Sequence, residues 1–265
     1  GGGNLLAAYQ LFETIEYAAK LDLLSRKLSD PRKVTQEQLS FWDARTAPET
    51  RTQQCAAGEK ESEIRAEMLQ KLRRGCEHAL LLGSLGVCSA RVDAQSFLIT
   101  PDGMDNALLE AEDLVLVRDG KPEADKQPAR ETALHAEIYA RHAEINAVFS
   151  AAPAHVAAFM SAGAPFETST VPESFYMLRA VPKYTMEEFC CAPEDAAARF
   201  SSKTPVALFE NSRSVTTGAT LFTAFDRLEV AEATAASILV AREAGSVIFL
   251  SEGEIQALKT TFHLE

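Results

Sequence analysis

After Gly83, segments with the pattern of a strand alternate with segments with the pattern of a helix. This order is the feature that most limits which folds the chain can adopt. Short apolar runs bounded by turn residues such as Pro101, Asp102 and Gly103 predict strands, and apolar residues at helical spacing predict the helices between them. The expected strands are 87–92, 96–100, 114–118, 146–149, 206–210 and 214–217, and the expected helices are 131–142, 154–161 and 221–244. A loop-rich segment with four prolines is expected at 165–193. This order predicts mixed α/β layers.

Before Gly83 the spacing of apolar residues is helical. In the first expected helix, 5–24, they are Leu5, Tyr9, Phe12, Ile15, Ala19 and Leu23, and Asn4 is the expected N-cap. Further helices are expected at 35–42 and 59–82, with an exposed loop at 44–58 between them. We therefore predict a helical N-terminal extension, residues 1–82, packed on a main domain of residues 83–265.

Composition limits the partners of such a fold. The chain has 265 residues, a formal net charge of −12 and 46% hydrophobic content, which allows one well-buried core. The acidic balance argues against nucleic acid, since phosphates require a basic face. The longest apolar run, 79–87, is shorter than the roughly 20 residues of a membrane span, and the start lacks a signal-like segment, so a cytoplasmic protein is expected. Five cysteines without CxxC spacing are expected to be reduced thiols.

Five segments between residues 82 and 244 carry motifs in a recognisable order. They are LGVCSARV (85–92), FLITPDGM (97–104), LVLVRDGKP (114–122), ETALHAEIYARHAEINAV (131–148) and LFENSRSVTTGATLFTAFDRLEVAEATA (208–235). In this order they resemble the class II aldolase/adducin family. The resemblance implies a three-layer α/β/α fold around a mainly antiparallel sheet.

The resemblance also implies a chemistry. Catalytic members of the family hold Zn²⁺ with three histidines, and the metal acts as a Lewis acid on a sugar phosphate while a glutamate moves the proton. Glu131 falls on the position of that glutamate. The three histidine positions are occupied by Ser150, Ala152 and Ser212. Zinc ligands are therefore expected to be absent, and no cofactor is expected.

Other histidines could compensate only in part. His155 lies three residues after Ala152 and could rescue one ligand, but we favour a partly buried histidine at a helix N-terminus. His135 and Glu137 are expected to be polar residues of a surface or interface. A serine hydroxyl and an alanine methyl do not replace zinc ligands.

The family's phosphate-binding positions are altered as well. The resemblance places Val87 and Ala129 where the family has polar side chains, and Asp102 with Gly103 in its threonine-glycine turn. Arg130 could grip an anion, or could form a salt bridge to Glu131 or Asp102, which is the favoured interpretation. Together with Arg130, the candidate ligand-binding residues are Asp102, Gly103, Ser89 and Asn211.

The sequence leaves two functions open: a binding or assembly protein, and an enzyme. The first is an aldolase-fold protein that has lost the zinc-dependent chemistry and serves in binding or assembly, as the adducin branch does. The resemblance implies a homo-oligomer, possibly a tetramer, and the N-terminal helices could contact a protein partner. The alternative is a carbohydrate enzyme, a sugar-phosphate aldolase or epimerase-like lyase, in which Glu131 is the general acid/base and Arg130 replaces the metal charge.

Overall fold

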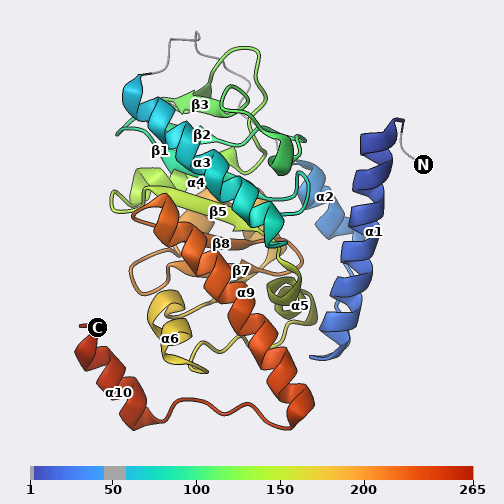
Figure 1. Ribbon diagram of the computed structural model, residues 1–265, viewed down its shortest axis with the longest axis vertical. Coiled ribbons are helices and arrows are strands. Elements are labelled where there is room, and N and C mark those ends of the chain that lie inside the picture. Colours follow the sequence, from blue (N-terminus) through green and yellow to red (C-terminus); the bar gives the residue numbers. More distant parts are fainter. Residues whose placement is uncertain (1–2, 45–57, 265) are drawn as a thin grey trace.

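The structure is a computed structural model that describes residues 3–44 and 58–264, and an eight-stranded sheet forms its centre (Figure 1). The strand order is β4-β3-β2-β1-β5-β8-β7-β6. Within the described residues β6 and β7 pair in parallel, and the other neighbours pair antiparallel. The strands are β1 (Val87–Arg91), β2 (Ser96–Ile99), β3 (Val115–Arg118), β4 (Lys121–Pro122), β5 (Ala147–Ala151), β6 (Lys183–Tyr184), β7 (Val206–Phe209) and β8 (Ser214–Gly218). The prediction of a mainly antiparallel sheet is confirmed.

Helices cover both faces of this sheet and complete the three layers. Figure 1 shows α3 and α9 crossing one face, and α4, α7 and α8 pack on the other. The helices are α1 (Leu5–Arg26), α2 (Gln36–Ala44), α3 (Glu59–Glu77), α4 (Thr132–Arg141), α5 (Ala154–Ala162), α6 (Pro172–Leu178), α7 (Met186–Cys191), α8 (Pro193–Ala197), α9 (Leu221–Ala244) and α10 (Glu252–Thr261), with a 3₁₀ turn η1 (Asn106–Leu108). The α/β/α architecture is thus confirmed, with helices at the N-terminus.

The alternation of side chains along β5 decides which residues reach each layer. Phe149 packs with the α3 and α9 side of the core, whereas Val148 belongs to the core under α4. Because successive strand residues point to opposite faces, Ser150 lies on the α4 side with Val148. This register places one of the expected histidine positions against α4.

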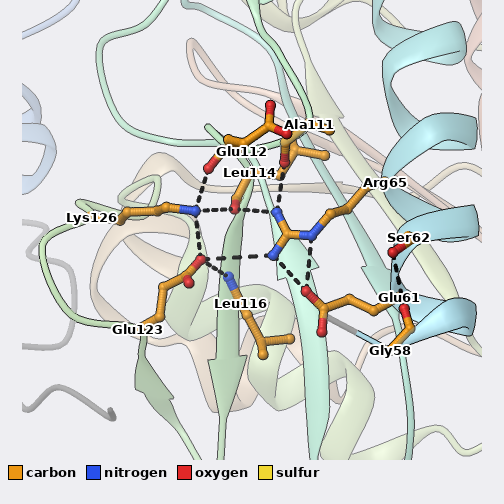
Figure 2. A network of polar contacts seen from close by, with 10 residues as sticks. All are labelled: Gly58, Glu61, Ser62, Arg65, Ala111, Glu112, Leu114, Leu116, Glu123 and Lys126. Carbon is orange, nitrogen blue, oxygen red and sulfur yellow. Dashed lines mark hydrogen bonds and ion pairs between the residues drawn. The ribbon is translucent and has the colours of Figure 1, made fainter. Parts of the chain in front are cut away.

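A buried ionic network fastens α3 to the sheet (Figure 2). The guanidinium of Arg65 donates to the carboxylate of Glu61 at 2.6 and 2.9 Å and to the carbonyl oxygens of Ala111 and Leu114, each at 2.7 Å. It also lies 3.8 Å from the carboxylate of Glu123, which follows β4. Full pairing offsets the cost of burying these charges. The network therefore ties α3 to the residues just before β3 and to the residue after β4.

The N-terminal helix α1 contacts the body with one face only. Its side chains Tyr17, Leu21 and Leu24 pack beside α5, and Asn4 caps the helix by accepting a hydrogen bond from the Ala7 amide at 2.8 Å. The stripe of apolar residues seen in the sequence faces solvent; it consists of Leu5, Tyr9, Phe12, Ile15, Ala19 and Leu23. Helix α1 therefore presents an apolar outer face.

Helix α3 ends five residues earlier than expected. Ala79 adopts a left-handed conformation with φ of 54°, and the amides of Leu80 and Leu81 both turn back to the carbonyl of Gly75. The expected loop at 44–58 falls largely on residues 45–57, outside the described residues. Among the described residues, no helix combines the length and apolar character that a membrane crossing requires.

The segment 165–193, expected to be loop-rich, also contains the short elements α6, β6 and α7, which the sequence did not predict. Local capping explains the short helices: Pro172 starts α6, and Thr185 with Glu188 forms a reciprocal capping box at α7. A second box, Ser251 with Glu254, starts α10, which the sequence analysis also missed. The elements α6, β6 and α7 have seven residues or fewer, which is too short for apolar periodicity to reveal them.

Candidate functional site

The residues singled out by sequence gather where α4 begins and where β5 and β7 end. Glu131 immediately precedes α4 and is buried. Its Oε1 lies 3.9 Å from Nε of Arg213, which is also buried, in the turn from β7 to β8. The Arg213 guanidinium also lies over the Trp42 ring, 4.7 Å from its centroid. The expected proton-transfer residue therefore faces an arginine.

Sequence reasoning did not select Arg213 as a site residue. The only signal was its place next to Ser212, a position where the family resemblance implies a histidine. The turn itself is tight: Asn211 has φ of 50°, and the amide of Phe209 donates to the Arg213 carbonyl at 2.8 Å. This geometry brings Arg213 to Glu131 across more than eighty residues of sequence, which no local pattern indicates.

Ser150 takes part in a buried chain of polar side chains. Its Oγ lies 2.8 Å from Nε2 of His135, whose Nδ1 lies 2.7 Å from Oγ of Ser89, and this hydroxyl contacts the Tyr139 hydroxyl at 2.7 Å. Burial lowers the pKa of His135 to about 4, so the imidazole is neutral at pH 7. The expectation that His135 is a surface or interface residue was therefore wrong, because α4 turns this side chain inward onto β1 and β5.

Ala152 and Ser212 line a cavity rather than join that chain. The Ala152 carbonyl accepts a hydrogen bond from the Tyr17 hydroxyl of α1 at 2.7 Å. Burial raises the pKa of Tyr17 to about 12, so this hydroxyl stays protonated. The Ser212 hydroxyl is buried and has no hydrogen-bond partner among the residues that the structure describes. An unsatisfied hydroxyl beside a cavity marks a place where a polar ligand atom could bind.

The cavity has a volume of about 260 Å³ and lies between α1, α5 and the turn from β7 to β8. Its lining consists of Tyr17, Leu21, Arg32, Val34, Leu80, Leu81, Leu82, Leu85, Gly86, Ala152, Ala157, Met160, Ser161, Asn211, Ser212 and Arg213. The candidate residue Asn211 is thus at this cavity. Most of the lining is apolar, and two arginines supply positive charge.

The remaining candidates lie elsewhere. Arg130 Nε is 3.4 Å from Oδ2 of Asp102, and both side chains are partly exposed. Pairing between the loops holds them together, since Pro101 bridges to Pro128. Gly103 has φ of 71°, which suits the turn, and none of these three candidates lines the cavity. Arg130 therefore contacts Asp102, one of the two partners that the sequence suggested.

The side chains at the three expected histidine positions do not fit a zinc site. Ser150 is held by His135, Ala152 has only a methyl group, and Ser212 offers one hydroxyl, whereas zinc requires thiolate, imidazole or carboxylate ligands. His155 contacts the Glu232 carboxylate at 2.6 Å through Nδ1. The described residues contain no cluster of three or more His, Cys, Asp or Glu side chains arranged to hold a metal ion.

Comparisons with known proteins agree with the fold and the motifs. A 5-methylthioribulose-1-phosphate/5-deoxyribulose-1-phosphate aldolase from Escherichia coli O45:K1 is 31% identical over 119 residues, 43% of this chain. The matched region spans about half of that relative, 53% of its length.

Solved structures are similar over most of the chain. The Escherichia coli protein YgbL aligns with a TM-score of 0.69 at 21% identity, covering 75% of this chain and 99% of its own. An L-fuculose 1-phosphate aldolase aligns with a TM-score of 0.66 at 18% identity, covering 78% and 98%. At these identities the alignments establish the fold. The model of the class II aldolase and adducin N-terminal domain matches residues 66–239, and the chain therefore belongs to the class II aldolase/adducin family.

Proposed function

We propose that this protein uses the class II aldolase fold for binding and assembly and has lost zinc-dependent aldol chemistry. The observation that carries the proposal is the state of the three ligand positions. Ser150 belongs to a buried chain with His135, and Ala152 and Ser212 line a mostly apolar cavity. None of these side chains is a usual zinc ligand, which supports the loss of the family's Lewis acid.

The environment of Glu131 supports the same proposal. In a zinc aldolase the glutamate exchanges protons beside a metal-bound substrate. Here its carboxylate faces the Arg213 guanidinium at 3.9 Å in a buried setting. A buried carboxylate that faces a guanidinium can serve as one half of a structural ion pair, a role that needs no substrate beside it.

An assembly role is supported by the outer face of α1. The face carries Leu5, Tyr9, Phe12, Ile15, Ala19 and Leu23 in the open. Phe12, Ile15 and Ala19 follow the three- and four-residue steps of a helix-pairing seam. Such a stripe can pair with the same stripe of a second copy in a two-fold arrangement. We therefore propose that α1 mediates a homo-oligomer.

The alternative is a sugar-phosphate lyase or epimerase that relies on Glu131. The 31% identity to a sugar-phosphate aldolase favours it, and Arg213, rather than Arg130, would supply the positive charge near the carboxylate.

Turnover separates the two. Purified protein is assayed with 5-deoxyribulose 1-phosphate, L-fuculose 1-phosphate and a set of 2-keto acids, beside Glu131→Gln. We expect the parent protein to show no turnover above the level of Glu131→Gln, because under this proposal both proteins lack the metal. Catalysis that falls by a hundredfold or more in Glu131→Gln, the contribution typical of a general acid or base, would establish the alternative.

A further inference from the structure

The cavity beside Ser212 has the features of a binding site for a small organic anion. We propose that it binds a carboxylate with a short apolar body, with the head group at Ser212 and Arg213 and the body against the leucines of residues 80–85. This inference deepens the proposed binding role and rests on it. The cavity is enclosed in part by α1 and by residues 32–34, which follow it.

The enclosure of the cavity is a fixed part of the fold. The Tyr17 hydroxyl donates to the Ala152 carbonyl at 2.7 Å, and the Ser29 hydroxyl donates to the Ala162 carbonyl at 2.9 Å. The Arg32 amide donates to the Ser161 carbonyl, also at 2.9 Å. These three bonds hold α1 and residues 29–32 against the residue after β5 and the C-terminal end of α5. The cavity walls are therefore in place before a ligand arrives.

The charge of the cavity lining differs in sign from the net charge of the protein. The protein carries a net charge of −12, yet the charged side chains among the described lining residues are two arginines, Arg32 and Arg213. Their acidic partners, Glu210 and Glu131, are not part of the lining. Each arginine already contacts a carboxylate outside the lining, Arg32 to Glu210 at 2.7 Å and Arg213 to Glu131 at 3.9 Å. A guanidinium has five N–H donors and can contact more than one acceptor, and its planar fork matches the carboxylate of a ligand.

The cavity offers a polar group for the head of the ligand and apolar walls for its body. The Ser212 hydroxyl is buried at the cavity and has no partner within the described chain, so it can donate to a carboxylate oxygen. The neighbouring walls are Leu21, Leu81 and Met160, which suit an alkyl body. Small-molecule sites measure roughly 300–1,000 Å³, so a cavity of about 260 Å³ suits a ligand at the small end. A carboxylate of about six carbons combines these properties.

Hexanoate is the probe, with hexan-1-ol and acetate as controls for the body and the head group. Titration calorimetry at pH 7 is expected to show one hexanoate site per chain and at least about tenfold weaker binding of either control. Equal affinity for hexanoate and hexan-1-ol, or no heat of binding for hexanoate, would overturn the proposal.

Variants at the exposed rim test the location without disturbing the core. Val34 lines the cavity and is 40% exposed. Val34→Asp is expected to weaken hexanoate binding by about fivefold, and Val34→Lys to strengthen it, through the added charge. The matched control Val171→Asp, on exposed Val171 before α6, makes the same change of net charge away from the cavity and is expected to leave affinity unchanged. Equal effects of the two Asp variants would rule out this cavity.

These measurements are independent of catalysis. Hexanoate binding with the predicted charge dependence supports the cavity proposal even if sugar-phosphate turnover is found, and a protein without turnover that ignores hexanoate refutes the cavity proposal alone. The two proposals therefore fail on separate observations.

Discussion

Among single residues, Ser150 differs most from what the family resemblance implies, because its hydroxyl contacts the buried imidazole of His135. An imidazole enclosed by α4, β1 and β5 donates to or accepts from two serine hydroxyls and is fully buried. A buried histidine of this kind holds a strand residue in place instead of exchanging protons with solvent, since burial disfavours its charged form.

This burial makes stability depend on pH. The folded pKa of His135 is lowered to about 4, while the unfolded chain has about 6.5, so between these values the unfolded state binds the extra proton. The free energy of unfolding should therefore keep its full value above about pH 6.5, where His135 is neutral in both states. It should fall by up to about 3 kcal/mol as the pH decreases towards 4. Urea unfolding across this range measures the slope.

His135→Gln should flatten that part of the curve, because glutamine does not titrate. The matched control is His78→Gln, at the exposed C-cap of α3, which should keep the parent slope. Parallel curves for the parent and His135→Gln would show that the imidazole is not held neutral in the folded protein.

At the scale of elements, the long pieces were predictable and the short ones were not. Helix α9 begins at Leu221 and ends at Ala244, as its apolar spacing indicated, and β8 begins at Ser214 as expected. Periodicity over many residues identifies such elements. Helices α6 and α7 begin at local signals, Pro172 and the Thr185 capping box, but their six or seven residues carry no apolar period that would identify a helix. The packing of Phe189 is a tertiary contact, which the sequence alone does not show.

Helix α1 carries a row of exposed apolar side chains on its outer face. Its outer apolar stripe is expected to hold copies together, so the double variant Phe12→Glu with Ile15→Lys should lower the oligomeric order measured by sedimentation or light scattering. Both side chains are exposed, so each chain should stay folded.

A matched pair elsewhere controls for charge and lost apolar surface. Phe222→Glu with Val240→Lys changes two exposed residues of α9 in the same way and should leave the oligomer intact. The assembly proposal fails if both double variants have the same mass in solution as the parent, or if the parent is a monomer.

At the scale of the whole molecule, the site combines parts that the sequence revealed with parts that only folding could assemble. The motif order predicted the family, and it placed Glu131, Ser150, Ala152 and Ser212 at one site by resemblance. The ion pair of Glu131 with Arg213, and the closure of the cavity by Tyr17, join segments far apart in the chain. Such contacts depend on how α1 and the turn from β7 to β8 pack, which residue types alone do not specify.

The proposed loss of zinc-dependent chemistry requires that this aldolase fold hold no zinc ion. Elemental analysis of protein purified without chelator, then titrated with Zn²⁺ and dialysed, measures it most directly. We predict far less than one zinc per chain after dialysis, because Ser150, Ala152 and Ser212 supply no ligands. One zinc retained per chain, released by chelator and restored on adding Zn²⁺, would show that the protein keeps a zinc site.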